Sequence, residues 1–357
     1  MMDSAQTLWS ELRQAGLVWA DAPPTDADET PWYVRTMLGV AGWIAALFLL
    51  GFIGAALAFV MRSEGAMIGV GLVAIGGAYA IFRAAGKGAF LSQFGFAASV
   101  AGQALVIMGL AGTVKPEHAA FWLIVAALEA ALAIALPNFV HRVWSAFAAA
   151  TALTVFLALS HAFFVATGLL SALVLAAWLG ELTWASAHSI VRSSAYGLTL
   201  ALLQAVGFVA FWTMDVERFF SQSGAQQWLQ PWMGEGLAAA VLVVAVYQLL
   251  QRAGISPLRR DAMAALLAAA LIGLASLKAP GIAAGLMVLL LGFAGGNKVL
   301  TGLGIAALLL YLSAFYYTLH STLLVKSGVL AATGGLLLVT RFAGLQWFLQ
   351  DAETDHA

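Results

Sequence analysis

About twelve apolar segments follow one another between Thr36 and Arg341, with almost no soluble sequence separating them. A helix needs roughly 20 predominantly apolar residues to cross the hydrocarbon core of a bilayer. Only 9% of the residues are charged, whereas a soluble domain carries roughly 25%. The sequence therefore predicts an all-α fold, a polytopic transmembrane helix bundle of about 12 spans, and leaves no room for a large soluble domain.

The predicted spans divide the chain into three parts. Residues 1–35 are expected to form a cytoplasmic extension with a short amphipathic helix and an acidic linker, although an ordinary solvated tail explains them equally well. Residues 36–341 form the membrane domain, and residues 342–357 form a C-terminal tail. The expected spans are 36–61, 65–82, 94–112, 119–136, 144–159, 163–179, 195–212, 234–250, 261–277, 281–296, 299–318 and 323–340.

The basic residues predict the orientation, because cytoplasmic loops carry an excess of lysine and arginine. With an even number of spans and a cytoplasmic N-terminus, eleven of the 16 basic residues fall on the cytoplasmic side. Both termini are therefore expected in the cytoplasm. The cytoplasmic group is Arg13, Arg35, Arg83, Lys87, Arg142, Arg192, Arg252, Arg259, Arg260, Lys298 and Arg341, and the other is Arg62, Lys115, Arg218, Lys278 and Lys326.

The two halves of the membrane domain share an order of features. In each half, the order is a basic loop, a span, a turn with Lys-Pro or Lys-Ala-Pro, another span, and then an asparagine with a basic residue. Asn138 and Asn297, the only asparagines, take equivalent places in this order. The pattern indicates six plus six spans in parallel orientation, one of the known transporter plans. The alternative is coincidence, with both asparagines simply capping helix ends.

Several classes of function lack their usual residues. The chain has no cysteine, which excludes disulfides, thiolate metal sites and a cysteine nucleophile. Its net charge of −1 gives no basic surface for nucleic acid, and its six histidines show no metal-ligand spacing. Nucleotide-binding, zinc-protease and serine-hydrolase motifs do not occur. We therefore predict no catalytic residue, metal or cofactor, although an intramembrane enzyme assembled from distant residues is not excluded.

Glu129 is the sharpest single feature, because it lies near the middle of the span AAFWLIVAALEAALAIAL. A carboxylate at this depth costs roughly 2.5–3.5 kcal/mol by insertion scales, so it should face the protein interior. It is the only acidic residue that we expect deep in a span. It serves either as a proton- or cation-coupling residue or as a protonated structural group. We expect a polar partner on a neighbouring helix, with Gln103 and Gln204 as the first candidates.

Further polar positions lie near the ends of spans. Tyr316 and His320 are four residues apart and share a helix face, and Lys326 either snorkels to the interface or marks an anion site. Residues 213–233 form the longest predicted external connection, with aromatic residues that suit the membrane surface. Glu181, Trp184, His188 and Arg192 recur at spacings of three and four, so they are expected to form one polar face of a cytoplasmic helical connection.

Three stretches resemble a known family: PWYVRTMLGVAGWIAALFLLGFIG at 31–54, AGQALVIMGL at 101–110 and YLSAFYYTLHSTLLVKSGVLAATGGLLLVTR at 311–341. The chain is similar to the DUF4401-type family of uncharacterised bacterial multi-pass membrane proteins, whose domain has no known function. The resemblance implies a location in the bacterial inner membrane. It also implies association with a smaller membrane-linked partner that carries a GDYXXLXY motif, but it implies no activity and no functional residues.

The function remains open between three hypotheses. The leading one is a transporter-like protein for a small solute or lipid, with Glu129 near its pathway. The second is a non-catalytic membrane scaffold for a partner protein, and the third is an integral enzyme that acts on a lipid-linked substrate. A cavity at the depth of Glu129 would favour the first, and polar groups converging at one interface would favour the third.

Overall fold

The structure is a computed structural model, and it describes residues 62–84, 89–181, 187–221 and 231–318, with scattered residues before position 52. All regular secondary structure in these ranges is helical, as the sequence predicts. The chain divides into two compact units, Met1–Leu105 and Val106–Ala357. The predicted first and last spans, the N-terminal extension and the C-terminal tail lie wholly or largely outside the described residues.

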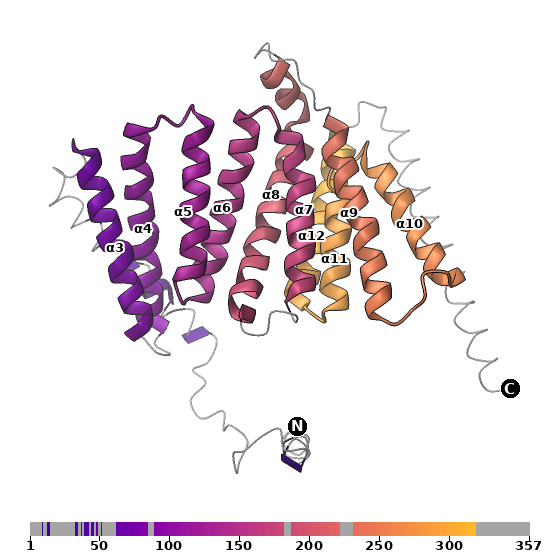
Figure 1. The fold of residues 1–357 in the computed structure, drawn as a ribbon, viewed down its shortest axis with the longest axis horizontal. Coiled ribbons are helices and arrows are strands. Elements are labelled where there is room, and N and C mark those ends of the chain that lie inside the picture. Colours follow the sequence, from indigo (N-terminus) through magenta and orange to yellow (C-terminus); the bar gives the residue numbers. More distant parts are fainter. Residues whose placement is uncertain are drawn as a thin grey trace. The chain divides into compact units, whose positions relative to one another are not determined.

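The helices carry the labels of Figure 1. The first unit contains α3 (Glu64–Ala84) and most of α4 (Ala89–Thr113). The second unit contains the end of α4 and eight further helices. These are α5 (Ala119–Ala135), α6 (Phe139–Leu159), α7 (Phe163–Gly180), α8 (His188–Ser221), α9 (Pro231–Arg252), α10 (Arg260–Ser276), α11 (Ile282–Ala294) and α12 (Lys298–Thr318).

Seven of the described helices are long and apolar enough to cross a membrane, namely α3, α4, α6, α7, α8, α9 and α12. Helices α5 and α11 are apolar but shorter, with 17 and 13 residues. Large apolar side chains such as Leu271 and Phe293 are exposed, which suits contact with lipid rather than water. The chain is therefore an integral membrane protein.

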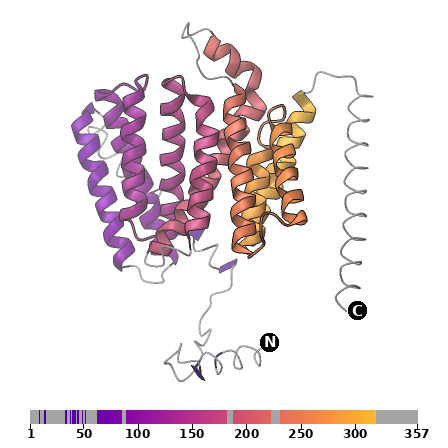
Figure 2. The ribbon, with the colours of Figure 1, turned by 45° about the vertical axis from the view of Figure 1, so that its right-hand side comes forward.

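Within the second unit, the helices pack in a connected series (Figures 1 and 2). Helix α6 contacts α5 and α8, α7 contacts α8 and α9, α9 contacts α10 and α11, and α11 pairs with α12. Five fully buried residues from five of these helices belong to the same core cluster: Leu170, Leu202, Leu242, Met287 and Leu300. Helix α8 packs on α6, α7, α11 and α12, so it is central in this unit.

Some predicted boundaries are wrong because local hydrogen bonds extend the helices. Helix α6 begins at Phe139 rather than at residue 144, because the Asn138 side chain accepts a hydrogen bond from His141 N at 2.9 Å and caps the helix. Helix α8 begins at His188 and continues to Ser221, so much of the predicted 213–233 connection is helical. Residues 222–230 lie outside the described ranges.

Gly197 lets α8 approach α6 closely. A Cβ atom at this position would lie 2.7 Å from Ala146 Cβ and 2.8 Å from Phe147 N, closer than such atoms can approach. Small residues at helix interfaces permit this kind of contact inside membranes. The packing of α6 on α8, which positions the candidate site, therefore requires a residue without a side chain at position 197.

We predict that Gly197→Ala lowers the free energy of unfolding by roughly 1–3 kcal/mol, because the added methyl group overpacks the α6–α8 contact. Gly302→Ala in α12 is the matched control, since its Cβ would meet no described atom within 4 Å. Thermal unfolding of the purified protein in detergent measures both variants. Equal stability of the two variants would contradict the close packing of α6 and α8.

Candidate functional site

Glu129 is buried in the protein, as the sequence predicts, with 1% of its surface exposed. It lies well inside α5, which runs from Ala119 to Ala135, and away from both helix ends. Its side chain is hydrogen-bonded to Ser145 of the neighbouring helix α6. The expected polar partner exists, but it is a serine that the sequence analysis does not nominate.

The two carboxyl oxygens of Glu129 differ in their surroundings. Oε2 is buried and has no hydrogen-bond partner among the described residues. Apolar residues of the same helix pair, Val125, Ala126 and Ala152, form a buried cluster beside this region. A carboxyl group with one engaged and one unpaired oxygen can hold a proton without losing its existing contact.

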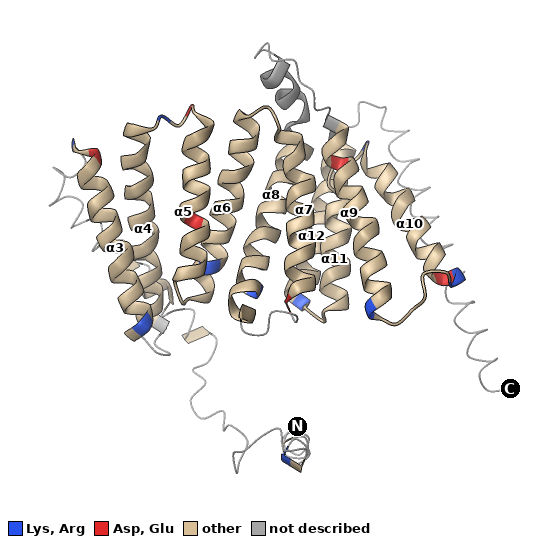
Figure 3. Cartoon of the chain, in the orientation of Figure 1, with Lys and Arg blue, Asp and Glu red and all other residues tan. Residues whose placement is uncertain are grey.

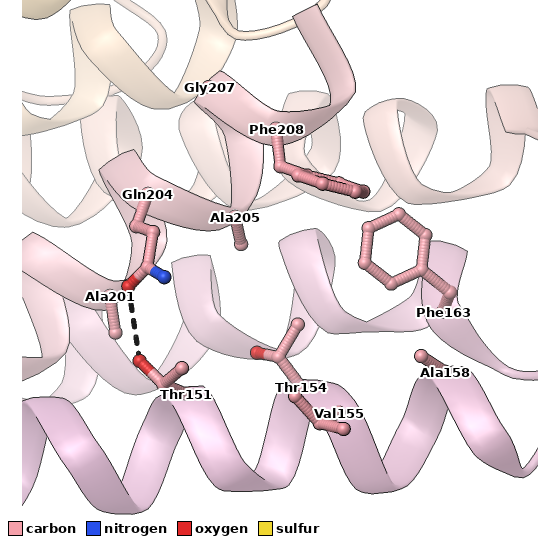
Figure 4. A pocket seen from close by; sticks show the side chains of 10 residues that line it. All are labelled: Thr151, Thr154, Val155, Ala158, Phe163, Ala201, Gln204, Ala205, Gly207 and Phe208. Atoms are coloured by element: carbon pink, nitrogen blue, oxygen red, sulfur yellow. Dashed lines mark hydrogen bonds between the residues drawn. The ribbon is translucent and has the colours of Figure 1, made fainter. Parts of the chain in front are cut away.

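Gln204 is one of the two glutamines expected as partners of Glu129. It lies in a cavity between α6, the start of α7 and α8. Its carboxamide oxygen accepts a hydrogen bond from the Thr151 hydroxyl at 3.1 Å (Figure 4). The cavity has a volume of about 520 Å³. Thr154 turns its hydroxyl back to Ala150 O at 2.9 Å, so its methyl group is available to the cavity wall.

The lining of this cavity is apolar apart from these three side chains. Val155 and Ala158 of α6, Phe163 of α7 and Phe208 of α8 form most of the wall (Figure 4). The Phe163 and Phe208 rings pack edge to face, with centroids 6.0 Å apart. Gln204 and Phe208 are both exposed on the outer side of α8, so the cavity opens away from the core.

Polar groups converge at the end of the second unit where α6, α8 and α12 begin. Glu181 Oε1 lies 3.6 Å from Arg192 Nε and 3.9 Å from His188 Nε2, so three of the four residues of the predicted polar face meet. The fourth, Trp184, lies outside the described residues. Arg142 of α6 donates a hydrogen bond to Ser189 Oγ of α8 at 3.1 Å.

Asn297 joins α12 to α8 at the same end. Its amide nitrogen lies 2.7 Å and its Oδ1 lies 3.0 Å from the Tyr196 hydroxyl, and Oδ1 also accepts from Leu300 N at 3.1 Å. Asn297 therefore caps the start of α12 as Asn138 caps the start of α6. The Tyr196 ring also packs edge to face against Trp178, with centroids 4.9 Å apart.

Glu235 was missed by sequence reasoning, which placed Glu129 alone among buried acidic residues. Glu235 lies in the first turns of α9 and is 4% exposed, and its Oε2 accepts a hydrogen bond from Gly281 N at 3.2 Å. Gly281 has a φ of 93°, which favours glycine, and it precedes α11. Tyr311 is buried in the same part of the bundle and donates to Leu203 O at 2.7 Å.

The other predicted site residues are not brought together with Glu129 by any contact that we describe. Gln103 is buried on α4 within the first unit. Tyr316 is near the end of α12, where its ring packs edge to face on Tyr317. His320 and Lys326 lie outside the described residues. In the described part of the chain, no group of three or more acidic or histidine side chains is placed to hold a metal ion.

One comparison with known proteins gave a match. A family model described as "Domain of unknown function (DUF4401)" matches residues 31–347. No curated protein and no solved structure matches the chain.

We predict that Glu235→Leu lowers the free energy of unfolding by about 1–3 kcal/mol, because it leaves Gly281 N–H buried without its acceptor. Glu235→Gln keeps an acceptor oxygen at the same place and should unfold near the wild-type temperature. Thermal unfolding in detergent measures both. If the two variants are equally destabilised, the hydrogen bond to Gly281 is not what stabilises this region.

Proposed function

We propose that this chain, which belongs to the DUF4401 family, is a transporter-like integral membrane protein that carries a lipid-type amphiphile between α6 and α8. The match over residues 31–347 confirms the family that the sequence indicates, and the family has no assigned activity. The observation that carries the proposal is the cavity around Gln204, which places an amide and two threonines inside an apolar chamber at span depth.

The cavity suits an amphiphile for three reasons. Its volume of about 520 Å³ falls within the roughly 300–1,000 Å³ of small-molecule sites. Its walls are mainly aliphatic and aromatic, which favours an acyl chain over a hydrated solute. Gln204 lies on the exposed side of α8, where lipid alone would leave its amide nitrogen without a partner. A hydroxyl or ester oxygen of a bound lipid would supply that partner.

Glu129 is the proposed coupling residue. Its unpaired Oε2 leaves room for a proton, and its bond to Ser145 connects it to α6, the helix that also carries Thr151 and Thr154. Neither of the two cavities that we describe is lined by Glu129. Its protonation would therefore act on the cavity through the position of α6, not by contact with the lipid.

The proposed architecture has about 12 spans in two parallel sets of six. Support comes from two helix pairs, α5–α6 and α11–α12. In each pair a short apolar helix is followed by a turn and by a longer helix that an asparagine caps. Unusually short segments in corresponding positions of two halves often mark a transporter's binding region.

The proposed topology places both termini in the cytoplasm and the membrane domain, residues 36–341, in a bacterial inner membrane. Within the described part of the second unit, one end of the bundle carries more basic residues (Figure 3). The basic residues at or near that end are Arg142, Arg192, Arg252, Arg259, Arg260 and Lys298, and those at the other end include Lys115 and Lys278. A GDYXXLXY-type membrane-associated partner is proposed from the family resemblance alone.

We predict that Thr154→Trp blocks lipid transfer, because the indole fills the cavity beside Phe163 and Phe208. The assay uses vesicles with reconstituted protein and a fluorescent phospholipid, and dithionite quenches label in the outer leaflet. Transfer between leaflets should fall to the rate of protein-free vesicles. Ile134→Trp on α5, where the side chain is 63% exposed, is the control and should transfer lipid normally. Unchanged transfer by a folded Thr154→Trp protein would refute the pathway.

We predict that Glu129→Gln folds with normal stability but loses the part of lipid transfer that depends on a pH gradient. Glutamine keeps the shape and the hydrogen bond to Ser145 but cannot ionise. Glu235→Gln is the matched control, since it changes another buried carboxyl group in the same way and should retain that dependence. Full gradient-dependent transfer by Glu129→Gln would show that Glu129 is only structural.

A further inference from the structure

A second cavity, of about 690 Å³, lies where α6, α8 and α12 begin. Its polar lining comes from the first turns of α8 and includes His188 and Arg192. Its apolar lining includes Leu200, about three turns farther along α8, and Leu303 of α12. The cavity thus has a polar side at the start of α8, whereas the rest of its lining, including the starts of α6 and α12, is mainly apolar. This combination suits the headgroup and acyl chain of a lipid molecule.

Arg192 is placed to bind an anion at the polar end. Its Nε faces Glu181 Oε1 at 3.6 Å, and its side chain is 48% exposed. Neither of its terminal amino groups makes a hydrogen bond within the described residues. A guanidinium group presents such donors in a planar fork that matches two phosphate oxygens. The Glu181 contact orients the guanidinium while leaving that fork available.

Taken together, the charged groups around the polar side of this cavity favour the binding of an anion. Glu181 is the carboxylate beside the cavity, and it also lies 3.9 Å from His188 Nε2. Arg142 reaches Ser189 of the cavity wall, and Lys298 is the first residue of α12. The first turns of α6, α8 and α12 line the cavity, so the partial positive charge of these three helix dipoles lies nearest to it. The C-termini of α5, α7 and α11 lie at the same end and oppose this charge in part, but none of their residues lines the cavity. Among the described residues beside the cavity, Glu181 is the one carboxylate, and its single negative charge does not balance these groups.

The apolar wall distinguishes a lipid from a free anion. Phe139 at the start of α6 is 51% exposed, and Val299 at the start of α12 is 63% exposed. Both line the cavity together with Leu200 and Leu303. A soluble phosphate ion would gain nothing from these side chains, whereas an acyl chain would cover them. Tyr196, hydrogen-bonded to Asn297, holds the α8 and α12 walls in place.

We infer that the cavity between the starts of α6, α8 and α12 binds an anionic phospholipid, with its phosphate on Arg192 and an acyl chain against Leu200 and Leu303. This inference rests on the proposed function, because it names the ligand class for the same helix pair, α6 and α8. The Gln204 cavity lies farther along these two helices. A lipid bound at Arg192 is therefore at the entrance of the proposed pathway.

The first test compares Arg192→Gln with Arg259→Gln. Arg259 is also paired with an acidic residue, Asp261 at 3.1 Å, but it does not line the cavity. Phosphatidylglycerol is titrated into delipidated full-length protein in detergent, and binding is followed by native mass spectrometry and thermal stability. Arg192→Gln should weaken binding by about tenfold or more, as expected for a lost charge-assisted bond. Arg259→Gln should bind as the wild type does.

The second test uses a variant that is expected to bind the lipid more tightly than the wild type does. Glu181→Gln removes a negative charge beside the phosphate site but keeps an amide oxygen that can contact Arg192 Nε, so phosphatidylglycerol should bind several-fold more tightly than to the wild type. A variant that merely damages the fold cannot produce tighter binding. Phosphatidylcholine and inorganic phosphate are the two reference ligands, and each should bind clearly more weakly than phosphatidylglycerol.

Three results would overturn the inference. Phosphatidylcholine has the same phosphate beside a choline cation, so its equal binding would show that the net negative charge of the headgroup is not selected. Equal binding of inorganic phosphate would show a free-anion site. Equal loss in Arg192→Gln and Arg259→Gln would show a non-specific charge effect. These outcomes leave the proposed function standing if Thr154→Trp still blocks transfer of lipid. If Thr154→Trp still transfers lipid while phosphatidylglycerol binds normally, the proposed pathway is wrong but the phospholipid site at Arg192 stands.

Discussion

Lipid offers no hydrogen bonds, so every polar group at membrane depth must find its partner within the protein. The described polar contacts follow this constraint. Glu129 bonds to Ser145, and Glu235 accepts from the backbone of Gly281. Several hydroxyls, such as those of Ser171 and Thr199, donate to the carbonyl four residues earlier in their own helix. Two exceptions among the described residues, Glu129 Oε2 and the amide nitrogen of Gln204, are informative because the constraint makes them costly.

Helix α6 connects these exceptions to one another. Its side chains meet Glu129 through Ser145, line the Gln204 cavity through Thr151, and form the wall of the basic-end cavity through Phe139. Its tight approach to α8 at Gly197 means that a shift of α6 changes both cavities. Under the proposed function, protonation of Glu129 on α5 would act on both cavities through the position of α6.

Much of the helical architecture follows from the sequence, because the apolar segments are long and the bilayer permits little other than helices. The burial of Glu129 follows from the cost of a lipid-facing carboxylate in the same way. Its partner could not be predicted, since serines are frequent and helix pairing is set by tertiary packing. Glu235 was missed because it sits near a span end, and its acceptor role depends on a backbone N–H exposed by the turn at Gly281. The early start of α6 required recognising Asn138 as an N-cap.

The short length of α11 has a consequence for how the chain enters the membrane during synthesis. Its 13 residues extend only about 20 Å, less than the roughly 30 Å of the hydrocarbon core. Such a segment cannot be threaded into the bilayer as a span of its own. Instead it packs mainly on α12, and Glu235 of α9 accepts a hydrogen bond from Gly281, the residue directly before α11. We therefore expect α11 and α12 to enter the membrane together, as one helical hairpin.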